Sequence, residues 1–299
     1  MIVASAAFRP NQTLPVREFP KRVLVAVVLI PIVLGCVWAG GAALVTLLAL
    51  ASGLAAWEFY RLAEARGVHA LAVPGIALSA LIPVLVHARY LGLWVPSVSV
   101  VALLVPLVLT MALFARGVAG SPMAAVGATL TGIVYTGGML SFAYALRYQE
   151  FAVGARAGTI LVMFPVVVTW LNDSGAYFFG RRFGRARLMP SVSPGKTWAG
   201  AYGAVLTSVL ATWLLAAQVL PRWANLRLGF ASILVVGITL SLAAQVGDLA
   251  ESMFKREAGV KDSSHLIPGH GGVLDRVDSL LFTLPVGFVL LGSLLRYAP

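Results

Sequence analysis

The chain alternates long apolar runs with short polar segments, a pattern typical of a protein that crosses a membrane several times. The first run, Val23–Trp57, contains no charged residue. At about 1.5 Å per residue, this run is too long for one helix across a hydrocarbon core of roughly 30 Å. Because Gly40 and Gly41 lie in its middle, the run predicts a tight hairpin of two short helices.

Further apolar runs of membrane-spanning length follow, and the pattern places their ends to within a few residues. They cover approximately Ala70–His87, Leu93–Ala115, Pro122–Leu146, Ala157–Tyr177, Thr197–Leu220, Leu228–Ala250 and Val273–Leu295. With the first hairpin they predict an all-α polytopic membrane protein of about nine transmembrane helices. We expect residues 1–22 to form a polar tail and residues 23–299 a single transmembrane domain, whose motifs fall in residues 157–296.

The composition excludes the soluble classes of protein. Hydrophobic residues make up 60% of the chain and charged residues only 11%, against about 25% charged residues in soluble domains. A soluble enzyme, a disordered chain and a coiled coil are therefore excluded. The single cysteine, Cys36, cannot form an intramolecular disulfide, and the sequence has no Cys/His spacing typical of a zinc site.

The basic residues indicate an orientation in the membrane. Lys and Arg outnumber Asp and Glu by 22 to 11, and they concentrate in alternate loops, as expected for loops that face the cytoplasm and anionic lipid. This distribution favours a cytoplasmic N-terminus. It also places the loops Gly180–Lys196 and Lys255–Gly272 on the same, cytoplasmic side, since two spans separate them. No basic stripe with interleaved aromatic residues suggests a nucleic-acid partner.

The acidic residues gather in one short region. Six of the eleven lie in a single segment: Asp248, Glu251, Glu257, Asp262, Asp275 and Asp278. Ionisable groups at membrane depth are costly and usually mark a functional site.

Helical spacing brings these groups onto common faces. Asp248, Ser252 and Lys255 share one helix face, and Asp275 and Asp278 share a face of the next helix. The three aspartates would repel one another in a partly dry site, and a Mg²⁺ ion bound by all three would remove that conflict. The alternative is that these carboxylates pair with arginines at the membrane surface, the candidates being Arg256 and Arg276.

The loop between the two helices has the composition of a phosphate-binding segment. Pro268 and Gly269 form a turn, and Gly271 and Gly272 leave backbone N–H groups approachable just before a helix start. Basic residues, among them Lys261, flank this loop. The alternative is a flexible loop rich in glycine and serine.

Two further segments contain polar groups near the same membrane surface. Ser193–Trp198 includes Gly-Lys-Thr, but Pro190 occupies the position of the first P-loop glycine, so this is not a Walker motif. Lys196 at a helix start still suits a triphosphate, and the alternative is an ordinary helix cap. Asn172 and Asp173 are placed to contact a nucleotide or a metal, or else to form an interhelical hydrogen-bonded pair.

At these residues the chain resembles a known family. The segment from Ser252 to Asp278, SMFKREAGVKDSSHLIPGHGGVLDRVD, is similar to the signature of the phosphatidate cytidylyltransferases, also called CDP-diacylglycerol synthases. Similarity extends upstream through Gln245–Asp248, Ser193–Thr197 and Asn172-Asp173. One departure is Ser264, where relatives often have glycine.

The resemblance implies transfer of CMP from CTP to phosphatidic acid, giving CDP-diacylglycerol and pyrophosphate. It also implies a Mg²⁺ requirement, a bacterial inner-membrane location with the site facing the cytoplasm, contact with membrane lipids, and a possible homodimer. Asp248 and Asp275 would be the metal ligands, with Asp278 in support. The expected catalytic residues are Asp248, Asp275, Lys255 and Ser252. The expected substrate-binding residues are Lys196, Thr197, Ser193, Asn172, Asp173, Arg256, Lys261, His270, Gly271, Gly272 and Arg276.

Two other functions are compatible with parts of the pattern. A CTP-dependent kinase of polyprenols or other lipid alcohols would need a base to deprotonate the alcohol, whereas a lipid phosphate is already anionic. A transporter of anionic substrates would place its polar residues near mid-membrane, often in paired repeats, whereas here they gather at one surface.

Overall fold

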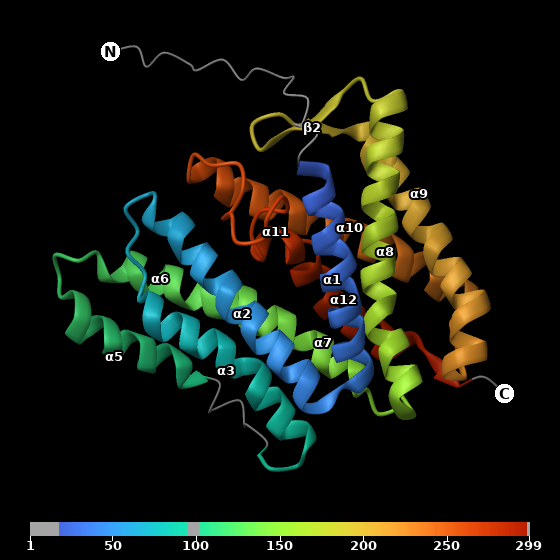
Figure 1. Ribbon diagram of the computed structural model, residues 1–299, viewed down its shortest axis with the longest axis horizontal. Coiled ribbons are helices and arrows are strands. Elements are labelled where there is room, and N and C mark those ends of the chain that lie inside the picture. Colours follow the sequence, from blue (N-terminus) through green and yellow to red (C-terminus); the bar gives the residue numbers. More distant parts are fainter. Residues whose placement is uncertain (1–17, 95–101, 298–299) are drawn as a thin grey trace.

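The computed structural model describes residues 18–94 and 102–297 and consists almost entirely of helices (Figure 1). The helices are α1 (Glu18–Ala39), α2 (Gly41–Glu64), α3 (Ala72–Tyr90), α5 (Leu104–Arg116), α6 (Pro122–Gly132), α7 (Met139–Arg147), α8 (Gly154–Phe183), α9 (Trp198–Leu214), α10 (Phe230–Glu257), α11 (Leu274–Val277) and α12 (Leu280–Leu294). Two π-helical segments continue helices without a break: η1 (Ile133–Gly138) joins α6 to α7, and η2 (Leu215–Ala224) extends α9.

The helices confirm an all-α membrane protein. Within the described residues, seven continuous helices are long and apolar enough to span a membrane, and two shorter apolar helices cover Val27–Ala39 and Leu104–Arg116. Each of the seven corresponds to a predicted run. The predicted run Leu93–Ala115 lies partly outside the described residues, and the shorter helix Leu104–Arg116 corresponds to the rest of it. The total of about nine spans and the cytoplasmic N-terminus stay predictions.

The predicted break in the first apolar run lies between α1 and α2. Gly40 and Gly41 both have positive φ, 65° and 45°, a conformation that glycine adopts without the cost other residues incur. The two helices have 22 and 24 residues and are longer than predicted. Helix α1 begins at Glu18, inside the predicted tail 1–22, and the first 17 residues of that tail lie outside the described residues.

Close packing of small residues holds the motif-bearing helices together. Helices α8 and α9 lie side by side (Figure 1), and their contact is lined by glycines. A Cβ on Gly175 would collide with Thr207, and one on Gly203 would collide with Phe179. Small residues at such positions allow helix backbones to approach closely in a membrane. Helix α10 packs on α9, and α12 packs against α7, α8 and α10.

The bundle has two chemically different ends. At the first, which we call the charged end, α2, α8 and α10 finish and α9 and α11 begin. The loops predicted to share a side do meet here, since Arg256 Nε donates to the carbonyl of Val192 at 3.3 Å. At the second, which we call the aromatic end, Arg147 and Tyr148 at the end of α7 contact the turn at Gly40.

Short strands occur at both ends, although the sequence did not predict them. An antiparallel hairpin of β1 (Arg187–Met189) and β2 (Ser193–Thr197) covers the charged end beside α8 (Figure 1). At the aromatic end, β3 (Leu226–Arg227) pairs with β4 (Arg296–Tyr297). Strand β2 leads directly into α9, so the hairpin determines where Lys196 lies.

Candidate active site

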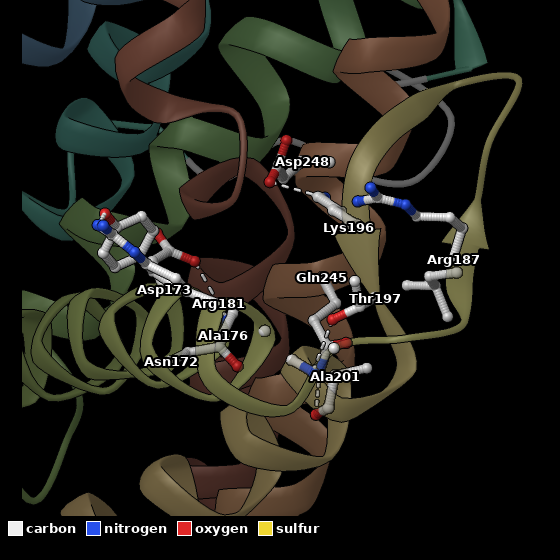
Figure 2. Close-up of a pocket in the computed structure, with 16 residues that line it drawn as sticks. Asn172, Asp173, Ala176, Arg181, Arg187, Lys196, Thr197, Ala201, Gln245 and Asp248 are labelled. Atoms are coloured by element: carbon white, nitrogen blue, oxygen red, sulfur yellow. Dashed lines mark hydrogen bonds and ion pairs between the residues drawn. The ribbon is translucent and has the colours of Figure 1, made fainter. Parts of the chain in front are cut away.

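Lys196 connects the β-hairpin to helix α10. Its Nζ lies 2.7 Å from Oδ2 of Asp248, and both residues line a pocket of about 650 Å³ at the charged end. Figure 2 shows this ion pair, which joins β2 to α10. The polar and charged residues of the lining are Asn172, Asp173, Tyr177, Arg181, Arg187, Lys196, Thr197, Gln245 and Asp248. The pocket therefore combines three cations with two carboxylates and the amide groups of Asn172 and Gln245.

Two of the predicted binding residues in this pocket also have structural roles. Thr197 caps α9, because its Oγ1 accepts a hydrogen bond from the N–H of Gly200 at 3.1 Å. The buried Asn172 accepts hydrogen bonds from Ser208 Oγ at 3.2 Å and Ser241 Oγ at 2.6 Å, which ties α8 to α9 and α10. In this structure Thr197 is therefore a helix cap, and Asn172 forms interhelical hydrogen bonds, as the alternative interpretations of these residues predicted.

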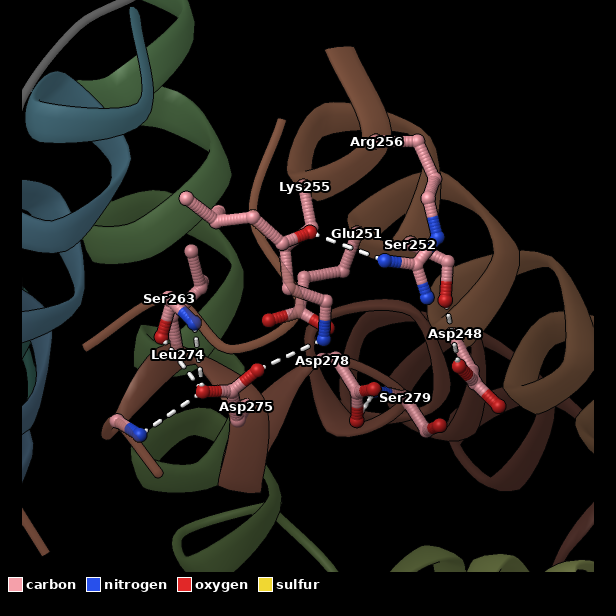
Figure 3. Close-up of polar contacts among 12 residues, drawn as sticks. Asp248, Glu251, Ser252, Lys255, Arg256, Ser263, Leu274, Asp275, Asp278 and Ser279 are labelled. Carbon is pink, nitrogen blue, oxygen red and sulfur yellow. Dashed lines mark hydrogen bonds and ion pairs between the residues drawn. The ribbon is translucent and has the colours of Figure 1, made fainter. Parts of the chain in front are cut away.

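A second ion-pair cluster lies around Lys255. Its Nζ donates to Asp275 Oδ1 at 2.7 Å and also to Glu251 Oε2, so one lysine neutralises two carboxylates. Ser252, on the same face of α10, donates to Asp248 Oδ1 at 3.3 Å. Figure 3 shows Lys255 between α10 and Asp275, with Asp248 further along α10. The predicted shared face of α10 is therefore correct.

Asp275 is the most heavily hydrogen-bonded of the predicted catalytic residues. Besides Lys255, its carboxylate accepts from the N–H and the hydroxyl of Ser263 at 2.9 and 2.8 Å, and from the N–H of Gly272 at 2.8 Å. These bonds fix both ends of the loop between α10 and α11 on a single side chain.

The start of α11, which we predicted to bind a phosphate, donates its backbone N–H groups to carboxylates of the protein. The N–H of Gly272 donates to Asp275, and the N–H groups of Val273 and Leu274 donate to Glu58 at 3.0 and 2.6 Å. Since these amides are already bonded, any phosphate at this loop must be bound by its other side, which forms a separate pocket.

That second pocket has a volume of about 580 Å³. Its charged and titratable lining residues are Lys261, Asp262, His265, His270 and Arg276. The predicted binding residues Lys261, His270, Gly271 and Arg276 meet here, whereas Ser193 and Gly272 line neither pocket. Arg256 is exposed and donates to the carbonyls of Val192 and Val260, so the proposed pairing of Arg256 with these carboxylates is not what the structure has.

The donors fit a hard divalent cation. Asp278 Oδ1 accepts from the N–H of Ser279 at 2.6 Å, and the buried Glu251 Oε1 has no hydrogen-bond partner among the residues that the structure describes. Within the described residues no three His, Cys, Asp or Glu side chains already converge as metal ligands. Mg²⁺ often needs only one or two protein carboxylates, because substrate phosphates complete its shell. Asp248 and Asp275 each pair with a different lysine here, and their joint binding of an ion stays a prediction.

Several residues of the site were not predicted from the sequence. Tyr177, Arg181, Arg187 and Gln245 line the first pocket, and Glu58 bonds to the signature loop from the N-terminal half of the chain. For Glu58 a signal was present, because it directly follows a long charge-free run, and carboxylates at membrane depth are rarely incidental.

Comparison with known proteins places this site in a family context. A model described as "Cytidylyltransferase family" matches residues 20–294. A phosphatidate cytidylyltransferase of Staphylococcus haemolyticus is 32% identical over 270 residues, which is 90% of this chain and 98% of that protein. Proteins of the same name from Staphylococcus epidermidis and Haemophilus influenzae are 41% and 44% identical over 51% and 47% of this chain. These two matches span 57% and 48% of the relatives, or about half of their length.

Proposed function

The chain belongs to the cytidylyltransferase family, and we propose that it transfers CMP from CTP to phosphatidic acid, giving CDP-diacylglycerol and pyrophosphate. The observation that carries the proposal is the presence of two lysine–carboxylate clusters at one end of a membrane bundle, one of which, Lys196–Asp248, lines a polar pocket. Relatives that match most of the chain have the name phosphatidate cytidylyltransferase.

The proposed reaction suits a site made of cations and carboxylates. A phosphate oxygen of phosphatidic acid attacks the α-phosphorus of CTP, a new P–O bond forms, and the bond from the α-phosphorus to the oxygen shared with the β-phosphate breaks. Pyrophosphate leaves with that electron pair. The nucleophile is already anionic at neutral pH, so no strong base is required. What remains is to position two anions and neutralise their charge.

The residues divide these tasks between the pockets. We assign CTP to the first pocket, where Lys196, Arg181 and Arg187 supply positive charge and Gln245 supplies an amide. We assign the remaining phosphate groups to the second pocket, where Lys261 and Arg276 lie. Lys255, with Ser252 beside it on α10, lines neither pocket and is oriented by Asp275 and Glu251.

Mg²⁺ completes the proposed site. Asp248 and Asp275 would hold it, with Asp278 in support, and when bound it would neutralise phosphate charge during the transfer. Oxygen ligands of this kind suit Mg²⁺ rather than softer metals.

We further propose that the charged end faces the cytoplasm of a bacterial inner membrane. The excess of basic residues in the loops at this end supports that orientation. Phosphatidic acid would then reach the site sideways from the bilayer, with its acyl chains among membrane lipids and its phosphate at the charged end. Assembly as a homodimer stays a prediction from the family resemblance.

Incubation of the purified protein with CTP, Mg²⁺ and dioleoyl phosphatidic acid tests the proposal. Pyrophosphate and CDP-diacylglycerol should form in equal amounts, and chelation of Mg²⁺ should stop both. Diacylglycerol in place of phosphatidic acid is the matched control, because a lipid-alcohol kinase would accept it. Product formation from diacylglycerol, or none from phosphatidic acid, would contradict the proposal.

A further inference from the structure

Glu58 is a buried carboxylate that connects the N-terminal half of the chain to the signature loop. It lies on α2, and its side chain is 0% exposed. Its Oε1 accepts from Ser264 Oγ at 2.6 Å and from the N–H of Val273 at 3.0 Å. Its Oε2 accepts from Ser263 Oγ at 3.1 Å and from the N–H of Leu274 at 2.6 Å. Four donors from one loop therefore satisfy a single carboxylate.

These four bonds hold both ends of the same loop. Ser263 and Ser264 lie near its beginning, whereas Val273 and Leu274 lie where α11 starts. A hydrogen bond to an ionised acceptor is stronger than one between neutral groups, and burial from water makes each of them harder to exchange. The loop is consequently held at two points against α2, a helix that lines neither pocket.

Gly272 shows how closely the loop approaches this carboxylate. A Cβ at this position would lie 2.2 Å from Ser263 Oγ and 2.5 Å from each Glu58 oxygen, so any side chain would have to displace both the hydroxyl and the carboxylate. From the sequence, this glycine was predicted to leave the backbone N–H accessible to a phosphate. In the structure its lack of a side chain makes room for Glu58.

The connection continues into the proposed active site. The Ser263 hydroxyl shares its one hydrogen between Glu58 and Asp275, the Ser263 N–H donates to Asp275, and Asp275 accepts from Lys255. We propose that Glu58 is a positioning residue for CMP transfer, which holds the loop so that Asp275 meets Lys255. The expected effect of Glu58 on kcat rests on the proposed function. Whether Glu58 holds the loop can be measured separately, by hydrogen exchange.

The substitution Glu58→Gln disrupts the four hydrogen bonds between this side chain and the loop, with little change in side-chain shape. Each carboxylate oxygen accepts one backbone N–H, from Val273 or from Leu274. Either orientation of a glutamine places its NH₂ group against one of these donors. A serine hydroxyl can rotate to relieve such a conflict, but a backbone N–H cannot, so one end of the loop has to move.

We expect kcat to fall about 100-fold, since displacements of about 1 Å have effects of this size. The KM for CTP should change less than about 3-fold, because Glu58 does not line the first pocket. Hydrogen exchange at residues 260–274 should accelerate, while exchange in α8 and α9 stays as in the wild type. A purely structural role would lower the yield of folded protein without this split between kcat and KM.

Glu64→Gln is the matched control, because Glu64 lies on the same helix with its side chain 66% exposed. It should match the wild type in kcat and in loop exchange. Ser264→Gly removes one of the four donors and should lower kcat by less than about 3-fold, since Ser263, Val273 and Leu274 still donate.

Gly272→Ala is the second variant if Glu58→Gln does not fold, because its Cβ would displace the Glu58 oxygens together with Ser263 Oγ, the group that joins Glu58 to Asp275. It should reproduce the fall in kcat and the faster loop exchange. Wild-type kcat in a folded Glu58→Gln or in Gly272→Ala would overturn the proposal, and so would unchanged loop exchange in both. If the wild type itself transfers no CMP, the proposed function fails, whereas loop exchange still reports whether Glu58 holds the loop.

Discussion

The two ends of the bundle use buried polar groups for different purposes. At the aromatic end, Arg147 is 5% exposed and donates to the carbonyls of Val37 and Trp38 at 2.9 and 3.1 Å. Tyr148 accepts from the N–H of Gly41 at 2.7 Å, and His87 bonds to the hydroxyl of Tyr144. Each contact completes a helix end or joins two helices. Arg147 and Tyr148 thus satisfy backbone groups, and His87 joins α3 to α7 through Tyr144.

At the charged end, carboxylates and lysines pair with one another beside open pockets. Lys196 pairs with Asp248, and Lys255 pairs with both Asp275 and Glu251. Paired charges in a partly dry site contribute little net stability, because desolvation offsets their attraction. The comparison teaches that burial of a charge does not by itself indicate a site. The distinguishing feature is the pairing of opposite charges at the end that has the two polar pockets, the first of which is lined by the Lys196–Asp248 pair.

The largest effect should come from Asp275→Asn. This variant removes the charge that faces Lys255, and it places an amide near the N–H donors of Ser263 and Gly272. We expect CMP transfer to fall at least about 100-fold while the protein stays folded, measured as pyrophosphate release and as the thermal unfolding midpoint. Glu257→Gln, at the exposed end of α10, is the control. Near wild-type turnover in Asp275→Asn would contradict the claim that the paired charges at the charged end serve catalysis.

A smaller and more selective effect should come from Lys196→Ala. A hydrogen bond to a charged group contributes about 1.5–3 kcal/mol, so loss of this cation should raise the KM for CTP by roughly 10-fold or more. The KM for phosphatidic acid should change much less, because Lys196 lines only the first pocket. Steady-state kinetics with each substrate varied in turn gives both values. An unchanged KM for CTP would show that the first pocket does not bind the nucleotide.

The smallest effect on activity should come from Arg147→Met at the aromatic end. The carbonyls of Val37 and Trp38 lose buried donors, which should lower the free energy of unfolding by about 1–3 kcal/mol. The kcat of the folded protein should stay at the wild-type value. Thermal unfolding and turnover of the same preparation test both, with Arg222→Met as an exposed control. A selective loss of kcat would mean that the two ends are coupled.

Local patterns predicted much of this structure. The charge-free length of Val23–Trp57 with its two central glycines predicted the break at Gly40, because a helix has a fixed rise and the membrane a limited thickness. Helical spacing predicted that Asp248, Ser252 and Lys255 share a face of α10. Because two spans separate the two polar loops, the sequence predicted that they lie at the same end of the bundle, where Arg256 does contact Val192.

Long-range contacts were beyond the reach of such patterns. Nothing in the local spacing around Glu58 indicates that its partners lie at Ser263 and Leu274, more than 200 positions away. The same contact places Glu58, together with Asp275, on the amides at the helix start where the sequence predicted a phosphate. The β1–β2 hairpin was also missed, because its residues are too few for a period-2 pattern to be visible.

The fate of isotopically labelled CTP tests the central claim most directly. The purified protein would be incubated with phosphatidic acid and Mg²⁺, and with CTP labelled in either its α- or its γ-phosphate. The account predicts that α-label enters the lipid while γ-label is released as pyrophosphate. Transfer of γ-label to the lipid, or no labelled lipid at all, would contradict it.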